Sequence, residues 1–346
     1  MPLIPANKQT LDVIIATYNR CALLSKTLKS LLAAKRPEGL SISVTVVDNN
    51  STDNTPTVVE EIANGGTPFP IRYLFEPKPG KSYALNAGLR STSGSLVGMI
   101  DDDEEIDSTW FQVILDRFKR KNIDFIGGPC HPNWTVAKPD WVTFDVGAAV
   151  GWVNWGCDEK PFERNGGILL GGNAVIRRSV FQIVGEYDVN LGRTAKGLLS
   201  YEDSDMYYRI LAAGFHGLYV PSLIIHHFVA PERLQKNYHR RWHWGNGIST
   251  GVLARREAAV TVEILGIPRW KLACCGKALV HRLAGLVGLA EKTASFHAEL
   301  KVWNLFGFIY GRHFCKTEST DGVTIAAQEL PLVHAQVEEA KLWLRA

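Results

Sequence analysis

Short apolar runs alternate with helix-like patterns along roughly the first 130 residues of the chain. The first run, residues 11–16, is almost continuously apolar, as expected of a strand buried on both faces. Leucines at helical spacing follow it, and the strand–helix order then repeats. Later strands are predicted at residues 42–47, 71–75, 96–100 and 123–127. This order predicts an α/β fold whose mostly parallel central sheet is flanked by helices.

The composition and charge narrow the functional classes. Of the 346 residues, 46% are hydrophobic and 21% are charged, which excludes disordered and collagen-like chains. The net charge of +3 is too small to indicate nucleic-acid binding by itself. However, residues 231–316 hold 14 Lys and Arg against 5 Asp and Glu, a local balance of +9. This part of the chain either meets an anionic partner or offsets an acidic body.

Cysteine usage and hydropathy bear on location. The six cysteines show no metal-site spacing, and a chain this long rarely needs a disulfide framework, so we expect a reducing compartment. No apolar segment follows a basic N-terminus, so no signal peptide is predicted. The longest apolar segment, 272–289, is a poor spanning helix because it contains Lys277, His281 and Arg282. We therefore expect a cytoplasmic protein whose membrane contact, if it has one, is lateral, on the inner face of the plasma membrane.

Two domains are expected. The main α/β domain covers residues 1–230 and includes an irregular, Trp- and Gly-rich insertion at about 129–172, too long for a plain connection. A basic, mainly helical extension covers residues 231–346. Its later helices, 271–289 and 296–314, mix Leu, Val and aromatic residues with Lys and Arg. That mixture is typical of helices lying in a membrane surface, and equally of a helical cap packed on the main domain.

Polar clusters follow three of the predicted strands, at residues 17–20, 48–51 and 101–103. Ligands of open α/β sheets bind at the carboxyl ends of the strands, so the three clusters predict a site. Asp101 and Asp103 have the chemistry for Mg²⁺ or Mn²⁺, which leave coordination positions for substrate phosphates. The alternative is an acidic solvated loop, because Glu104 and Glu105 continue the run. The chain has no GxxxxGK[ST] or GxGxxG phosphate loop.

Seven segments together carry a resemblance to a known family. They are IIATYNR (14–20), VVDNNSTDNT (46–55), GKSYALNAG (80–88), MIDDD (99–103), GGNAVIRR (171–178), VGEYDVNLG (184–192) and SYEDSDMYYR (200–209). In order and spacing they resemble the family 2 glycosyltransferases, over residues 10 to 250 or so. The resemblance implies the Rossmann-like GT-A fold and an inverting transfer of one hexosyl or related sugar in polysaccharide biosynthesis. It also implies a UDP-, GDP- or dTDP-linked donor, a glycan or lipid-linked acceptor, and Mn²⁺ or Mg²⁺.

The resemblance also assigns roles on the donor side. Thr17 and Asp48 match positions that hold the nucleoside, and Tyr18 lies beside the base. Lys81 matches a basic position near the donor, where it would offset phosphate charge; a solvated lysine in a first helical turn is the alternative. In the DxD motif, Asp101 matches the carboxylate near the ribose and Asp103 the one that contacts the metal.

On the acceptor side, the resemblance makes Asp203 the general base that deprotonates the acceptor hydroxyl. An inverting displacement needs one such carboxylate opposite the leaving group. The alternative is that Glu202 and Asp203 only cap the N-terminus of a helix. Gly172 and Asn173 match the acceptor-side strand, and Glu202 is also expected to contact the acceptor.

Histidines and a basic aromatic segment complete the predicted site. His226 and His227 end a predicted strand. In some related transferases a histidine at this position completes the metal site. Only one of the two can face the site, and His226 is preferred. Arg241 is expected to bind the diphosphate and Trp242 to stack on a sugar. Tyr238 stands where processive relatives carry a Gln, so processive synthesis is not expected.

Two rival functions remain at this point. A sugar-nucleotide nucleotidyltransferase on a similar fold also pairs carboxylates with a metal and a nucleotide, but the phosphate loop it needs after the first strand is missing. A non-catalytic sugar-binding scaffold derived from a transferase would be expected to have lost some of the matched aspartates, which are all present.

Overall fold

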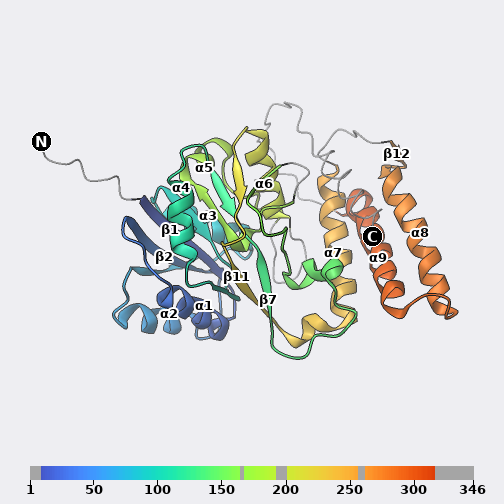
Figure 1. The fold of residues 1–346 in the computed structure, drawn as a ribbon, viewed down its shortest axis with the longest axis horizontal. Coiled ribbons are helices and arrows are strands. Elements are labelled where there is room, and N and C mark those ends of the chain that lie inside the picture. The colour runs from blue at the N-terminus through green and yellow to red at the C-terminus, as the bar shows by residue number, and fades with distance from the viewer. Residues whose placement is uncertain (1–8, 164–166, 192–200, 256–261, 316–346) are drawn as a thin grey trace, which may run out of the picture. The chain divides into compact units, whose positions relative to one another are not determined.

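The computed structural model describes residues 9–163, 167–191, 201–255 and 262–315 (Figure 1). The chain divides into two compact units. The first consists of residues 1–133, 151–189 and 202–229, and the second of residues 134–150, 190–201 and 230–346. Residues 134–150 thus group with the C-terminal helices. We describe each unit by itself.

An eight-stranded sheet forms the centre of the first unit. Its strands, in spatial order, are β3 (Ile71–Phe75), β2 (Leu40–Asp48), β1 (Gln9–Thr17), β4 (Leu96–Met99), β9 (Ala174–Arg177), β6 (Phe125–Gly127), β10 (Gly217–Tyr219) and β8 (Lys160–Pro161). Neighbours among β1–β4 pair in parallel, as do β6 and β10. Only β9 and β8 run against their neighbours. The predicted mostly parallel α/β sheet is therefore confirmed.

Helices flank this sheet. They are α1 (Cys21–Ala33), α2 (Thr55–Asn64), α3 (Lys81–Ser91), α4 (Trp110–Phe118), α5 (Arg178–Val184) and α6 (Glu202–Ala212). Strand β1 shows why its sequence is apolar: Leu11, Val13 and Ile15 join the large core, while Ile14 faces Gly88 of α3. A side chain at Gly88 would collide with Ile14, so this glycine lets α3 lie close to the sheet.

A second sheet, which the sequence did not predict, adjoins the end of β4. It is formed by β5 (Glu104–Ile106), β11 (Ile225–Val229) and β7 (Cys130–Trp134), with β11 in the middle. Strands β5 and β11 are antiparallel, with Glu104 opposite His227 and Glu105 opposite His226. Directly opposed residues share a face of a sheet, so this register decides which acid and which histidine face inward.

Three long helices dominate the second unit: α7 (Lys236–Leu253), α8 (Arg269–Leu286) and α9 (Lys292–His313). Short elements accompany them, namely η1 (Phe144–Val150), η3 (Pro231–Leu234), β12 (Glu263–Ile264) and β13 (Ile267–Pro268). Helix α9 packs against both α7 and α8. The predicted C-terminal helical extension is therefore confirmed.

Glycines make the contact between α7 and α9 unusually close. Gly247 and Gly251 on α7 meet the backbone carbonyls of Asn304 and Phe308, and a β-carbon at either glycine would overlap them. Gly307 and Gly311 on α9 meet the α7 backbone in the same way. Each helix thus presents a Gly-x-x-x-Gly pair to the other, a spacing that lets helix backbones approach closely.

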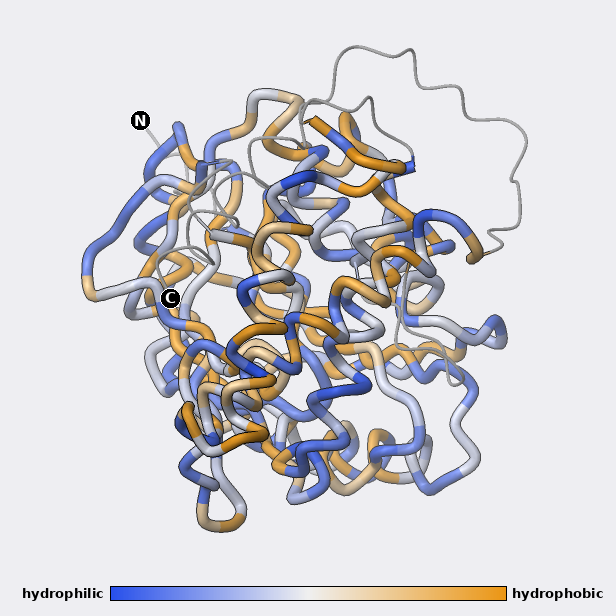
Figure 2. The backbone as a smooth tube through the Cα atoms, turned by 90° about the vertical axis from the view of Figure 1, so that its right-hand side faces the viewer, coloured by the Kyte–Doolittle hydropathy of each residue, from blue (hydrophilic) through white to orange (hydrophobic). Residues whose placement is uncertain are grey.

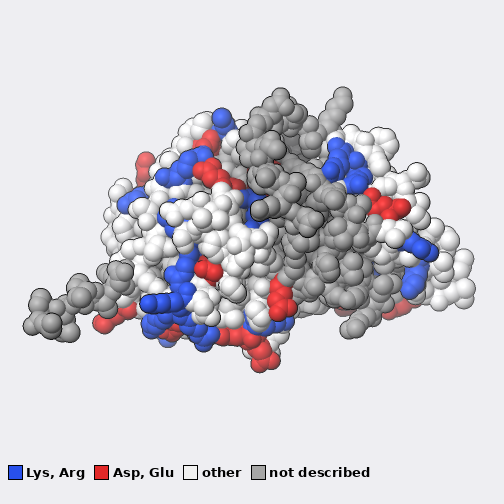
Figure 3. All heavy atoms as spheres, turned by 90° about the horizontal axis from the view of Figure 1, so that it is seen from above, with Lys and Arg blue, Asp and Glu red and all other residues white. Residues whose placement is uncertain are grey.

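Among the described residues, no helix is long and apolar enough to cross a membrane. On the face drawn in Figure 3, basic and acidic side chains of the described residues are interspersed. This mixture agrees with the small net charge of the chain.

Two buried histidines make the second unit sensitive to acid. Burial lowers the pKa of His239 to about 4 and that of His243 to about 3, so both are neutral in the fold. In the unfolded chain their pKa is about 6.5, so the unfolded state binds protons first as the pH falls. Stability is therefore lost progressively below pH 6.5 or so, by about 1.4 kcal/mol per histidine for each pH unit until the folded pKa is reached.

Denaturant unfolding near pH 7 and near pH 5 measures this loss. The double variant His239→Gln/His243→Gln should lose much less stability between the two conditions than the unaltered chain. An equal loss in both proteins would show that other groups set the acid sensitivity.

Candidate active site

The site lies where β1, β2 and β4 end. These strands are adjacent and parallel, with Thr17 of β1 opposite Asp48 of β2 and Ile14 of β1 opposite Met99 of β4. The loops that follow them therefore meet at one edge of the sheet, as the sequence predicts.

Side-chain amides tie these loops together. Asn19 adopts a left-handed backbone (φ 53°), and its Oδ1 accepts a hydrogen bond from the N–H of Thr52 at 2.7 Å. Asn49 donates to the carbonyl of Lys78 at 2.6 Å and accepts from the N–H of Gly80 at 2.7 Å. Asp48 is buried and accepts from the Tyr73 hydroxyl at 2.7 Å. The loops that follow β1, β2 and β3 are thus held in place by polar contacts of the chain itself.

Two of the three aspartates after β4 are buried and share one arginine. Arg20 Nη1 lies 3.0 Å from Asp102 Oδ1 and 2.9 Å from Asp103 Oδ2. The hydroxyl of Thr17 donates to Asp102 Oδ2 at 2.8 Å. Burial raises the pKa of Asp102 to about 6, although Arg20 acts in the opposite direction. Thr17 and Asp102 therefore connect β1 to the acidic run.

Lys81 joins three carboxylates from two segments, the loop after β4 and helix α6. Its Nζ lies 2.8 Å from Asp101 Oδ1, 3.8 Å from Glu202 Oε1 and 3.8 Å from Asp203 Oδ2. Burial alone would lower the pKa of this ammonium group, but the carboxylates, Asp101 foremost, raise it well above its usual value. Lys81 is therefore a permanent cation at the centre of an acidic cluster.

The pair Gly171–Gly172 lies against two of the acids. A β-carbon at Gly171 would overlap the carboxylate of Asp203, and one at Gly172 would overlap that of Glu104. These glycines thus make room for the protein's own carboxylates. Glu104 accepts a hydrogen bond from the N–H of Asp101 at 2.8 Å, and burial, with the charges of Asp101 and Asp103, raises its pKa well above its usual value.

The acids of the site differ in how far their side chains are exposed to solvent. The side chains of Asp101 and Asp203 are 36% and 25% exposed, whereas those of Glu202 and Asp103 are 3% and 5% exposed. Tyr18 is also exposed, at 43%. Asp101, Asp203 and Tyr18 therefore form the accessible part of the site, and the other acids form its floor.

The structure corrects the preference for His226. His227 is buried, and its Nε2 lies 3.5 Å from Asp103 Oδ2, whereas His226 is exposed on the other face of β11. The cause is strand register, because His227 pairs with the inward-facing Glu104 and successive strand residues alternate in direction.

The structure also places Asn173 differently from its predicted acceptor-side role. Its side chain is fully buried. Its Oδ1 accepts from Trp110 Nε1 at 3.0 Å, and its Nδ2 donates to the carbonyls of Pro129 and Leu223 at 3.2 and 2.7 Å. With each of these polar atoms occupied, Asn173 links three segments of the fold and has no free group for an acceptor.

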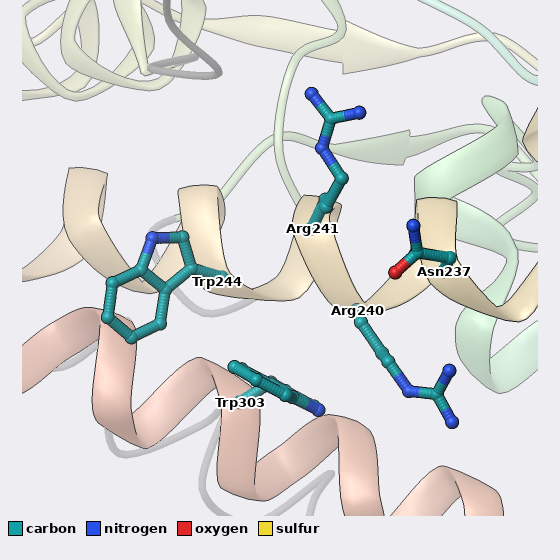
Figure 4. A pocket seen from close by; sticks show the side chains of 5 residues that line it. All are labelled: Asn237, Arg240, Arg241, Trp244 and Trp303. Atoms are coloured by element: carbon teal, nitrogen blue, oxygen red, sulfur yellow. The ribbon is translucent and has the colours of Figure 1, made fainter.

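Arg241 and Trp242 belong to α7 of the second unit. Arg241 lines a cavity of about 240 Å³ together with Asn237, Arg240, Trp244 and Trp303. In Figure 4 the two indole rings lie near each other, and the guanidinium groups of Arg240 and Arg241 point in different directions. Arg240 is engaged by Glu299, with Nε 2.5 Å from Oε1. Trp242 is half-buried and packs its ring edge-on against His243.

Three residues of the cluster escaped prediction as site members, namely Arg20, Asp102 and Glu104, and His227 was considered only as the alternative to His226. Arg20 ends a quoted motif, and Asp102 lies between the two acids of the DxD pattern, so both were in view without an assigned role. Glu104 entered only through the alternative of an acidic solvated loop, but it lies on β5 and is buried. The sequence does not reveal that β5 pairs with β11, and this pairing turns both Glu104 and His227 toward the site.

The donor atoms present fit a divalent cation. Six carboxyl groups surround the site (Asp101, Asp102, Asp103, Glu104, Glu202 and Asp203), against the two cations Lys81 and Arg20. A nucleoside diphosphate cannot approach such a surface without added positive charge. The carboxylate of Asp103 and the imidazole of His227 lie 3.5 Å apart, so both could bind one ion. Mg²⁺ or Mn²⁺ would take its other ligands from phosphate and water. No group of three protein ligands gathers within the described part of the chain.

Comparison with known proteins decides the family. A model of glycosyl transferase family 2 matches residues 12–184, half of the chain. The chain belongs to this family. It is therefore a glycosyltransferase, as the sequence motifs predict.

Individual relatives support this family assignment. The succinoglycan biosynthesis protein ExoM of Rhizobium meliloti is 25% identical over 252 residues, which are 72% of this chain and 76% of ExoM. A glucosyl-dolichyl phosphate glucuronosyltransferase of Haloferax volcanii is 30% identical over 191 residues, 53% of this chain and 57% of that protein. The mannosyltransferase PcManGT of Pyrobaculum calidifontis, solved with GDP-Man and Mn²⁺, has a TM-score of 0.58 at 18% identity, covering 87% of this chain and 86% of its own. The predicted GT-A fold is thereby confirmed.

The contact between Gly171 and Asp203 yields a test. In Gly171→Ala the new methyl group would displace the Asp203 carboxylate, and we expect about a hundredfold loss of transfer rate with the fold retained. Gly276→Ala on α8 is the matched control, because a β-carbon there meets no atom within 4 Å. Transfer rates and circular dichroism of both variants measure the effect, and full activity in Gly171→Ala would show that the position of Asp203 is unimportant.

Proposed function

We propose that this glycosyltransferase transfers a single sugar, with inversion at the anomeric carbon, from a nucleotide-sugar donor to a glycan or lipid-linked acceptor. The observation that carries the proposal is the pair Asp101 and Asp203, both accessible and both bound to Lys81. One carboxylate lies on the donor side and the other on a helix beside the acceptor-side glycines. An inverting displacement needs these two sides to face one reaction centre.

In this mechanism Asp203 accepts the proton of the acceptor hydroxyl while the hydroxyl oxygen attacks the anomeric carbon. The bond between that carbon and the nucleoside diphosphate breaks in the same step. Gly171 leaves the space that this carboxylate occupies. Lys81 pairs with both Asp203 and Asp101 and thereby holds the two carboxylates close to each other. Glu202 is too deeply buried to contact an acceptor, and its carboxylate pairs with Lys81.

On the donor side, Tyr18 lies beside the base and Asp101 contacts the ribose, while Thr17 and Asp48, which are buried and hydrogen-bonded within the fold, shape the nucleoside site through the loops that they fix. Asp103 and His227 would hold a Mn²⁺ or Mg²⁺ ion, which supplies the positive charge that stabilises the leaving diphosphate. Arg20 fixes the orientation of Asp103 through its 2.9 Å contact. The roles of Arg241 and Trp242, which belong to the second unit, stay predictions from the sequence.

The names of the relatives support the acceptor class. One acts in succinoglycan biosynthesis, and one is named for a dolichyl phosphate-linked sugar. We propose a polysaccharide or a lipid-linked precursor as acceptor, a cytoplasmic location, and membrane contact through the C-terminal helices. The family match favours this transferase over a nucleotidyltransferase or a non-catalytic scaffold.

Asp203→Asn tests the base directly. The amide keeps the size of the side chain but cannot take a proton, so transfer should fall by about 10²–10⁴-fold while donor binding stays nearly unchanged. Asp205→Asn is the matched control, since Asp205 lies on the same helix and pairs with Arg209 at 2.8 Å. Release of nucleoside diphosphate from a panel of sugar donors, measured with acceptor lipids present, gives the rate. Equal loss of donor binding in Asp203→Asn would overturn the assignment.

A further inference from the structure

Helix α8 packs on the rest of the second unit through one face only. Cys275 and Arg282 lie on this face: Arg282 Nη1 donates to Ser295 Oγ of α9 at 3.1 Å, and Cys275 contacts the carbonyl of Lys301. Of the α8 residues, all of which the structure describes, Ala278 is the one that is buried. Most of the helix surface is therefore left outside the fold.

The opposite face of α8 carries large apolar side chains. They are Leu279 (51% exposed), Val280 (67%), Leu283 (55%) and Leu286 (65%), continued past the helix end by Val287 (70%) and Leu289 (82%). At about 100° per residue the helical members fall on one stripe. We call these six residues the α8 apolar face. Figure 2, viewed from the side where α8 lies in Figure 1, shows hydrophobic turns interleaved with hydrophilic ones along the helices. A contiguous apolar surface of this kind is uncommon on a soluble protein and marks an interaction site.

Basic residues border the α8 apolar face. The helical rotation places the exposed Lys277 on one side of the stripe, whereas Arg282, on the other side, is paired with Glu299 of α9 at 3.3 Å. Residues 264–290 contain four Lys and Arg and no Asp or Glu. Glu263 and Glu291 lie just outside this segment, so the α8 apolar face itself contains no acid and is bordered by the exposed Lys277, the composition of a helix that lies in the headgroup region of an anionic bilayer.

The charge also decides between possible occupants. A symmetric contact between two copies through α8 would bring the cations of one copy against those of the other with no acid from this segment to pair them. An anionic lipid surface offers apolar chains to the leucines and phosphate groups to the cations. Lipid is therefore the occupant that satisfies both features at once.

We propose that the α8 apolar face docks this glycosyltransferase on an anionic membrane, with α8 lying in the plane of the interface. This deepens the proposed membrane contact by assigning it to one surface. It does not depend on the sugar transferred or on the identity of the catalytic base.

Vesicle flotation of the full chain tests the proposal. The protein should float with vesicles of phosphatidylcholine and phosphatidylglycerol, bind vesicles of phosphatidylcholine alone more weakly, and dissociate as salt is raised. The variant Leu283→Glu/Leu286→Glu should bind the anionic vesicles at least tenfold more weakly. Ile183→Glu is the matched control, because Ile183 is 71% exposed on α5 of the first unit, and it should bind like the unaltered chain. Lys277→Glu should reduce the preference for anionic vesicles.

Other outcomes would overturn the proposal. If the unaltered chain ignores anionic vesicles and is a dimer that Leu283→Glu/Leu286→Glu dissociates, the occupant is a second copy. If it is a monomer that binds vesicles only after removal of residues 316–346, the occupant is that segment. Nucleoside diphosphate binding, measured on the same variants, should not change. If the unaltered chain binds no nucleoside diphosphate, the proposed function is wrong. If it binds nucleoside diphosphate but does not float with anionic vesicles, the docking surface is wrong.

Discussion

The ion pairs of Lys81 and Arg20 are the constraint on which the active site depends. Six carboxyl groups come together at one edge of the sheet, and buried acids repel one another unless cations separate them. Lys81 links Asp101 with Asp203 and Glu202, and Arg20 links Asp102 with Asp103. The cluster still holds more acids than cations, which creates an attraction for a divalent ion and, through it, for a diphosphate.

The sequence predicted the parts of the fold that have simple physical signals. The strands β1–β4 are buried runs between helices, and their predicted bounds lie within two residues of the observed ones. Strand β5 was missed because it is three residues long and begins in an acidic run, where charge usually indicates solvent. The inward direction of His227 could not be predicted, because it depends on the register between β5 and β11, which are far apart in sequence. Asn173 was misassigned because a fully bonded buried amide and a ligand-binding amide look alike in sequence.

The second unit is organised by close packing of glycine. Gly247, Gly251, Gly307 and Gly311 let α7 and α9 approach backbone to backbone, and large side chains pack beside this contact, where Trp244 of α7 meets Trp303 and Tyr310 of α9. Trp303 and Phe306 of α9 are nevertheless 37% and 52% exposed. With the α8 apolar face, these groups give this unit much of the exposed apolar surface of the described chain. In the first unit the functional chemistry is carboxylate and cation, and in the second it is aromatic, apolar and basic.

The most direct test of the account is calorimetric titration of the protein with UDP, GDP and dTDP, each with and without Mn²⁺. The carboxylate excess predicts that one of the three diphosphates binds tightly when Mn²⁺ is present and weakly when it is absent, and that His227→Ala weakens only the metal-dependent binding. Tight binding of a diphosphate without metal, or no binding of any of them with metal, would contradict the account.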